Sequence, residues 1–382
     1  MKTISEFREK LLGKDLYHEF TARYVERMKK ADPIVIWGGS TAGQMFYDFL
    51  VEFGVYQNVK YFADNDKNKW GTRFNGLPVV SAEEVVRLVK DHSDTCIVIA
   101  SMYLPEIRKQ LLNLGIGEKN IDVNGVHLAR NHRVFRKKSA YEVICSRFED
   151  YEKVYTWLSD EHSKAVYLGY LNSMISLDIR FMEGIASPAD EQYFDRELIR
   201  LGEHEVFCDC GSFNGDTLET FAALTSGKYR KYIAIEADKD NYAELMQNIV
   251  VKGYKNIRTH NLACWNETTV LKFHPALTGG RVTDQGEVSV KADTLDNILK
   301  DEDVTFIKMD IEGSEEMALK GASEVIRRKK PTLAVCIYHS LEDFCRLPLL
   351  IKELNPDYRL YVRHYKDMND TETVCYAIPE DR

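Results

Sequence analysis

The chain has 382 residues, more than one ordinary domain needs, so its length predicts two domains and a connector. Its formal net charge of -9 argues against a nucleic-acid partner, because neutralising phosphates requires a basic surface. No apolar run reaches the length of a membrane span and residues 1–13 lack the apolar core of a signal peptide, so we expect a cytoplasmic protein without a membrane span.

The first part of the chain alternates strand and helix patterns, which predicts a small Rossmann-like, doubly wound domain over residues 1–130. A polar helix opens this domain. The first strand runs into a glycine turn at its end. The expected strands span residues 33–40, 59–63, 77–80 and 96–100, and the expected helices span 41–53, 82–90 and 105–114.

Residues 131–204 place apolar and aromatic side chains at helical spacing, which predicts a helical connector. We expect helices over 151–158, 166–179 and 191–201, with a break at Ser187-Pro188. Tyr193 and Phe194 lie shortly before the next strand and could close over a site there.

The last part, residues 205–382, predicts a second α/β domain. Its expected strands span 206–210, 232–236, 257–263, 270–274, 288–291, 306–310, 333–338, 359–363 and 373–378. The connection 365–370 is too short for a crossover helix, so the last two strands should form an antiparallel hairpin. The predicted fold class is therefore α/β, with two Rossmann-like doubly wound domains joined by a helical connector and a class I methyltransferase layout in the second.

A glycine loop in this domain predicts a nucleoside site. The strand that ends at Asp209 is followed by a Gly-x-x-x-Gly loop over 211–215, and the next strand ends at Glu236. The glycines allow close backbone approach, and a carboxylate at the end of the next strand can accept both ribose hydroxyls. Phe213 replaces the middle glycine of a dinucleotide loop, and Asp216 at the helix start would repel phosphate. A nucleoside without phosphates fits best, and S-adenosylmethionine is the commonest.

We assign roles to the residues around this loop on that basis. Asp209 and the loop amides should hold the methionyl part, Glu236 the ribose, and residues 262–264 the border of the adenine. The candidate cofactor residues are Asp209, Gly211, Ser212, Phe213, Asn214, Gly215, Asp216, Thr217, Glu236, Ala237, Leu262, Ala263 and Cys264.

Charged side chains gather at the end of the strand expected over 306–310. Lys308, Asp310 and Glu312 alternate to the same side of the chain, where α/β enzymes place catalytic groups. Asp310 is the main catalytic candidate. His339 follows the next strand and could accept a proton with an imidazole of ordinary pKa. Lys308 is either a third catalytic residue or one half of a structural ion pair. Alternatively, Asp310 and Glu312 hold Mg²⁺ or Mn²⁺ to acidify an acceptor hydroxyl.

Several segments match a known family in its order. They are Phe207–Thr217, Ile235–Asp238, Ala292–Ile298, Ile307–Glu315 and Lys320–Ala322. On these residues the second half of the chain resembles the FkbM-type methyltransferases. The resemblance implies S-adenosylmethionine-dependent O-methyl transfer to a hydroxyl of a sugar or glycan precursor. The family often shows Glu-x-His near residue 335; here Ile337 stands in place of the glutamate and His339 is retained.

The first domain resembles the small Rossmann-like modules found beside sugar-modifying enzymes. The similar segments are Gly38–Gly43, Asp64–Asp66, Trp70-Gly71 and Asn75–Val79. This resemblance implies a nucleotide-linked or sugar-containing ligand. Two other functions remain open: an NAD-dependent sugar oxidoreductase using the loop at 38–43, which lacks the full dinucleotide pattern, and a non-catalytic nucleotide-sugar-binding protein.

Overall fold

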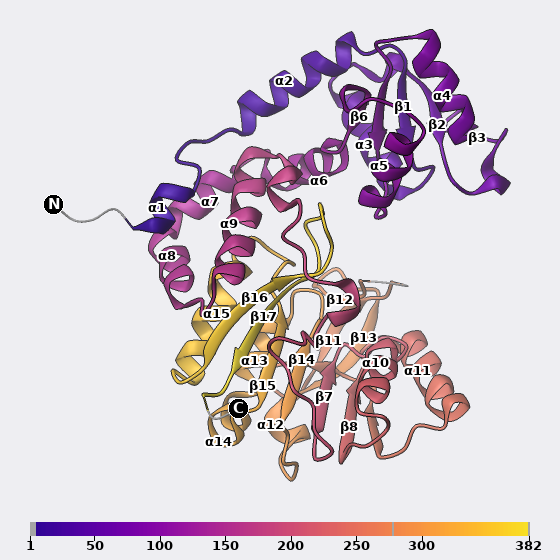
Figure 1. The fold of residues 1–382 in the computed structure, drawn as a ribbon. Coiled ribbons are helices and arrows are strands. Elements are labelled where there is room, and N and C mark those ends of the chain that lie inside the picture. The colour runs from indigo at the N-terminus through magenta and orange to yellow at the C-terminus, as the bar shows by residue number, and fades with distance from the viewer. Residues whose placement is uncertain (1–4, 277–278, 381–382) are drawn as a thin grey trace. The chain divides into compact units, whose positions relative to one another are not determined.

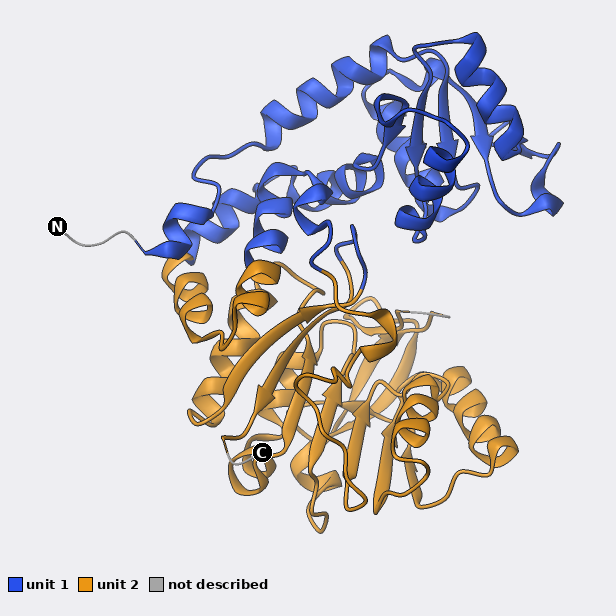
Figure 2. Cartoon of the chain, viewed as in Figure 1, with its two compact units in different colours: residues 1–147, 168–185, 366–370 blue, residues 148–167, 186–365, 371–382 orange. Residues whose placement is uncertain are grey.

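The computed structural model describes residues 5–276 and 279–380 (Figure 1). The chain divides into two compact units (Figure 2). Unit 1 comprises residues 1–147, 168–185 and 366–370, and unit 2 comprises residues 148–167, 186–365 and 371–382. The stretch 131–204, predicted as a connector, is divided between the two units. A short segment from near the C-terminus also belongs to unit 1, so the units are not consecutive pieces of sequence.

Unit 1 is built on a six-stranded sheet with the order β3-β4-β2-β1-β5-β6. The central strand β1 is wholly buried and pairs in parallel with β2 and β5, as its continuous apolar sequence requires. Its elements are α1 Glu6–Lys10, α2 Tyr17–Lys30, β1 Ile34–Trp37, α3 Thr41–Glu52, β2 Val59–Ala63, β3 Arg73–Phe74, β4 Leu77–Val80, α4 Ala82–Asp91, β5 Cys96–Ile99, α5 Leu104–Asn113, β6 Ile121–Asp122, α6 Gly125–Phe135 and α7 Ala140–Ser146.

Unit 2 contains a seven-stranded sheet with the order β16-β17-β15-β14-β7-β8-β9. Strands β15, β14, β7, β8 and β9 are parallel, whereas β17 is antiparallel to both of its neighbours. The predicted fold class and its terminal hairpin are therefore confirmed. The strands are β7 Val206–Cys210, β8 Lys231–Ile235, β9 Ile257–His260, β14 Phe306–Met309, β15 Thr332–Cys336, β16 Arg359–His364 and β17 Thr373–Ile378.

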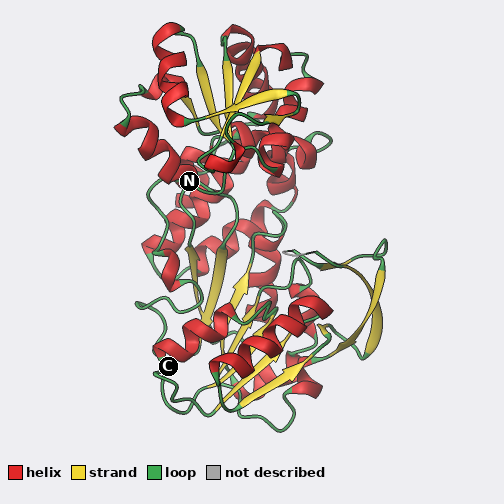
Figure 3. Cartoon of the chain, turned by 90° about the vertical axis from the view of Figure 1, so that its right-hand side faces the viewer, coloured by secondary structure: helices red, strands yellow, loops and turns green. Residues whose placement is uncertain are grey.

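Helices flank the strand layer of this unit (Figure 3). They are α8 Phe148–Trp157, α10 Asp216–Leu224, α11 Lys239–Lys252, α12 Leu295–Ile298, α13 Glu315–Lys320, α14 Ser323–Lys329 and α15 Asp343–Leu354, and α9 Glu161–Ser176 contains residues of both units. No helix in the described part of the chain combines the length and the apolar character that crossing a membrane requires.

A second, four-stranded sheet with the order β10-β13-β11-β12 lies in the same unit. Its strands are β10 Ala263–Cys264, β11 Thr269–His274, β12 Arg281–Val282 and β13 Val288–Asp293. The strand predicted over 257–263 is thus split between two sheets. Phe273 is the one buried residue of β11 and Ala292 the one buried residue of β13, so these strands carry too little apolar surface for the interior of a parallel sheet.

The helix predicted over 191–201 does not form. A 3-10 turn over Ala189–Glu191 is followed by turns, and Tyr193 has a left-handed φ of 67°. The Asp195 carboxylate accepts hydrogen bonds from the N–H groups of Glu197 and Leu198, a local pattern that competes with helix formation. The segment is anchored instead by Phe194, whose ring packs against aromatic rings from β7, α10 and β14.

Candidate active site

A cleft of about 410 Å³ opens in unit 2 where β7, β8 and β14 end. The carboxyl edge of a parallel sheet is the usual place for ligands in α/β proteins. Most of the predicted cofactor residues line the cleft: Gly211, Phe213, Asp216, Thr217, Glu236, Ala237, Leu262, Ala263 and Cys264. Lys308, Asp310 and Glu312 line it as well, whereas Asp209, Ser212, Asn214, Gly215 and His339 do not.

Asp209 faces the interior of the protein rather than the cleft. Its side chain is fully buried, Oδ1 lies 3.0 Å from Lys308 Nζ, and Oδ2 accepts a hydrogen bond from the Tyr232 hydroxyl. Lys308 Nζ also donates to the carbonyl oxygen of Gly211 at 2.6 Å. Burial disfavours the lysine's charge, but the carboxylates of Asp209 and Asp310 outweigh it and raise the pKa of Lys308. Asp209 therefore acts on the glycine loop through Lys308.

Three further loop residues shape the turn without lining the cleft. Ser212 Oγ donates to the carbonyl of Asp209 at 2.8 Å and accepts from the N–H of Ile235 at 3.0 Å, which ties β7 to β8. Asn214 donates to a Glu244 carboxylate oxygen at 3.0 Å. Gly215 starts α10 with a φ of 92°.

Gly211 is the position at which the loop needs a glycine most. Its φ is 80°, and a Cβ there would lie 1.9 Å from the carbonyl oxygen of Asp310. No side chain fits, so any larger residue would push β7 and β14 apart at the floor of the cleft.

Glu236 lies directly after β8 with its carboxylate at the cleft. Oε2 accepts the N–H of Phe213 at 2.9 Å, and Oε1 accepts the N–H of Asp238 at 2.8 Å. Each oxygen keeps a second lone pair for a ligand hydroxyl. Burial raises the pKa of Glu236 to about 7, although both backbone hydrogen bonds favour the ionised form.

The four-stranded sheet supplies apolar side chains to the cleft lining. Leu262, Ala263 and Cys264 line the cleft, and Phe273 and Val282 join them from β11 and β12. The sequence did not single out these two residues, because nothing in their strands indicates that the small sheet borders the cleft.

Asp310 lies immediately after β14 and lines the cleft. The Tyr193 hydroxyl donates to its Oδ2 at 2.7 Å, and the Tyr338 hydroxyl donates to its Oδ1 at 3.4 Å. Burial alone would raise the pKa of Asp310, but the positive charges of Lys308 and His339 lower it overall. Asp310 is therefore an ionised, firmly oriented carboxylate.

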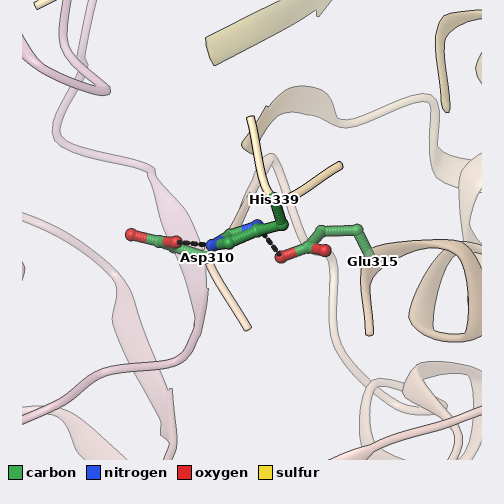
Figure 4. A group of neighbouring side chains, drawn as sticks. All are labelled: Asp310, Glu315 and His339. Carbon is green, nitrogen blue, oxygen red and sulfur yellow. Dashed lines mark ion pairs between the residues drawn. The ribbon is translucent and has the colours of Figure 1, made fainter. Parts of the chain in front are cut away.

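His339 lies behind Asp310, between two carboxylates (Figure 4). Its Nδ1 is 3.2 Å from Glu315 Oε1, and its Nε2 is 3.5 Å from both Asp310 Oδ1 and Glu312 Oε2. Burial would lower the pKa of His339, but Glu315 and the other surrounding carboxylates raise it to about 9. The imidazole is thus protonated at neutral pH, unlike the neutral proton acceptor expected from the sequence.

The matches to known families agree with this geometry. The family model described as the methyltransferase FkbM domain matches residues 209–367. Residues 209–367 form a methyltransferase domain of the FkbM family. A second model, described as C2185-like, N-terminal, matches residues 30–122. A search of curated proteins gave no match.

A solved structure shares the fold of the chain. The crystal structure of a methyltransferase FkbM from Methylobacillus flagellatus KT aligns with a TM-score of 0.67 and 22% identity, covering 94% of this chain and 93% of that chain. An rRNA methylase from Streptococcus thermophilus aligns with a TM-score of 0.33 and 14% identity, covering 47% of this chain and 90% of that chain.

Four of the ten non-glycine residues with left-handed backbone in the described part of the chain line the cleft. Tyr193, Phe213, Glu312 and Glu372 have φ values of 67°, 46°, 55° and 65°, and all four line the cleft. Left-handed backbone at residues other than glycine is costly and tends to gather at functional sites. Glu372 and Gln192, which hydrogen-bond to each other at 2.7 Å, were not predicted, because they come from turns that carry no motif.

Proposed function

We propose that the FkbM domain binds S-adenosylmethionine in this cleft and catalyses transfer of its methyl group to a hydroxyl of a sugar or glycan precursor. The observation that carries the proposal is Glu236: a buried carboxylate at the end of the second strand, with one lone pair open on each oxygen. When bound, the cofactor supplies an electrophilic methyl group on a sulfonium.

The residues present fit such a nucleoside. Glu236 would accept the two ribose hydroxyls, and the apolar set of Leu262, Ala263 and Cys264 would border the adenine. The floor at Gly211 leaves no room for a side chain, which supports close approach of the methionyl part to the backbone. Asp216 in the first turn of α10 disfavours phosphate, which argues against a dinucleotide here.

The polar residues of the cleft near Asp310, which we call its polar end, suit a hydroxylated acceptor. Gln192, Tyr338, Glu312 and Glu372 supply an amide, a phenol and two carboxylates there, all of which hydrogen-bond to hydroxyls. The preference for a sugar follows the resemblance to FkbM-type enzymes. An amine acceptor would use the same carboxylates, so product analysis must distinguish O-methylation from N-methylation.

We assign Asp310 as the group that receives the proton of the acceptor hydroxyl. As the new C–O bond forms, the acceptor oxygen loses electron density and its proton becomes acidic enough for a carboxylate to receive. His339, being protonated, would hold the charge of Asp310 rather than take the proton. Lys308 would keep the glycine loop in place and is a positioning residue.

The cavity of unit 1, about 600 Å³ in volume, is the site we propose for a nucleotide-linked ligand. Ser40, Thr41 and Ala42 line it from the N-terminus of α3, and Met102 and Tyr103 line it with side chains that are mostly exposed. Asp64, the residue that would grip a ribose in an NAD site, is paired with Lys69 at 2.7 Å, which weakens the oxidoreductase alternative.

Calorimetry on the full chain tests both sites. We expect S-adenosylhomocysteine to bind and NAD to show no heat of binding. A uridine or thymidine diphosphate sugar should bind separately, with its affinity reduced in Tyr103→Ala and unchanged in Glu236→Ala. Tight NAD binding without S-adenosylhomocysteine binding would reverse the assignment, and loss of nucleotide-sugar binding alone would remove only the unit 1 proposal.

A further inference from the structure

His339 presents an unsatisfied nitrogen to two carboxylates. Its side chain is only 10% exposed, and neither Nε2 nor Nδ1 has a hydrogen-bond partner among the residues that the structure describes. Asp310 Oδ1 and Glu312 Oε2 each lie 3.5 Å away. This spacing is long for a hydrogen bond. It matches the distance between two ligand atoms of one ion, because two metal–ligand bonds of about 2.1 Å at a tetrahedral angle place the ligand atoms roughly 3.4 Å apart.

The other nitrogen of the ring, Nδ1, faces a third carboxylate. Nδ1 lies 3.2 Å from Oε1 of Glu315, a carboxylate that is 1% exposed. The same oxygen accepts the N–H of Ile311 at 2.8 Å, so the backbone holds Glu315 in place. A buried carboxylate behind a histidine is the usual support of a metal-binding imidazole, because it can accept the Nδ1 proton and orient the ring. A divalent ion would replace the proton that Nε2 carries at neutral pH when no ion is bound.

We propose that His339 Nε2, Asp310 and Glu312 bind a divalent first-row transition ion, with Glu315 orienting the imidazole. Ligand atoms of Asp310, Glu315 and His339 lie within 4.8 Å of one another, and Glu312 is placed beside this group by the 3.5 Å between its Oε2 and His339 Nε2. Three carboxylates around one imidazole supply the negative charge that a divalent ion needs. One nitrogen and two oxygen ligands favour an ion such as Mn²⁺ or Zn²⁺ over Mg²⁺, which prefers oxygen ligands alone.

The position of the site gives the ion a role. Asp310 and Glu312 line the cleft while His339 does not, so open coordination positions would face the polar end. If the proposed methyl transfer is correct, a hydroxyl bound there would lose its proton more readily, because a bound cation lowers the pKa of coordinated oxygen. Binding of the ion itself requires neither cofactor nor acceptor.

Electron paramagnetic resonance of Mn²⁺ added to the chelator-treated full chain tests the site directly. We expect one bound Mn²⁺ per chain and a nitrogen coupling from the imidazole. His339→Ala should abolish that coupling, and Glu312→Gln, at a partly exposed side chain, should weaken binding at least tenfold. Glu315→Gln should weaken binding about 10- to 100-fold, the usual effect of losing a supporting partner. Mg²⁺ should compete poorly.

His274→Ala is the matched control, because this histidine is half-exposed and lies next to Glu287 outside the cluster. It should leave binding and coupling unchanged. No Mn²⁺ binding by the unmodified chain, or a nitrogen coupling that persists in His339→Ala, would overturn the proposal. S-adenosylhomocysteine binding, measured in parallel, separates the metal proposal from the cofactor proposal. If the unmodified chain does not bind S-adenosylhomocysteine, the proposed cofactor is contradicted and the metal result is unaffected.

Discussion

Lys308 and Asp209 form an ion pair behind the glycine loop, with Nζ 3.0 Å from Oδ1 and side chains that are 3% and 0% exposed. Lys308 also donates to the carbonyl of Gly211, so the pair joins β14, β7 and the loop that follows β7. Asp209, which we expected from the sequence to hold the cofactor, therefore stabilises the glycine loop through Lys308 instead.

Loss of this buried ion pair should strongly destabilise the protein. Lys308→Met should lower the free energy of unfolding by roughly 3 to 5 kcal/mol, because it leaves the buried Asp209 carboxylate without its partner. Chemical denaturation measures the change. Adding Asp209→Asn should recover part of the loss, whereas Lys320→Met, at an exposed surface pair with Glu316, should change little. A Lys308→Met protein of normal stability but without turnover would instead mark Lys308 as a catalytic residue.

Glu236 should dominate cofactor affinity. Glu236→Ala removes two charge-assisted hydrogen bonds of roughly 1.5 to 3 kcal/mol each, so S-adenosylhomocysteine binding should weaken by at least about 100-fold. Titration calorimetry measures this loss. Asp240→Asn on α11 is the control, since Asp240 is exposed and does not line the cleft. Equal affinities of Glu236→Ala and the unmodified chain would place the ribose elsewhere.

Cofactor affinity should depend on pH through the same carboxylate. Burial raises the pKa of free Glu236 to about 7, and ribose hydroxyls would favour the ionised form. Binding therefore releases a proton below this pH. Affinity should rise as the pH increases toward 7 and level off above it. Calorimetry in buffers of different ionisation enthalpy reports the proton release. The dependence should vanish in Glu236→Gln, and a slope that survives this change would assign it to another group.

Asp310→Asn should separate catalysis from binding. We expect turnover to fall by about 10² to 10⁴-fold, the usual range for losing a proton acceptor, with S-adenosylhomocysteine affinity within a few fold. Single-turnover methyl transfer to a hydroxylated acceptor measures the first quantity. Glu324→Gln, at an exposed position on α14, is the control. Normal turnover in Asp310→Asn would remove Asp310 from the chemistry.

Much of this architecture could be predicted from local patterns. Strands β7, β14 and β15 are wholly buried and mostly apolar, and the short connection between β16 and β17 permits only a hairpin. Glu236 was found because its place after the second strand follows from the strand pattern itself. The glycine loop at 211–215 was found for the same reason.

The missed features depend on tertiary contacts. The four-stranded sheet has few buried residues, and nothing in the sequence distinguishes its strands from those of the larger sheet. The segment around Tyr193 has helical spacing, but the side chain of Asp195 satisfies the backbone and stops the helix. The raised pKa of His339 arises from carboxylates, chiefly Glu315, whose proximity only the fold establishes.

A crystal structure of the full chain with S-adenosylhomocysteine would show directly whether the cleft holds the cofactor. We expect ribose hydroxyls within hydrogen-bond distance of both Glu236 oxygens, adenine beside Leu262 and Cys264, and the sulfur directed toward Asp310. Density for the nucleoside in the unit 1 cavity, with none between Glu236 and Asp310, would contradict it.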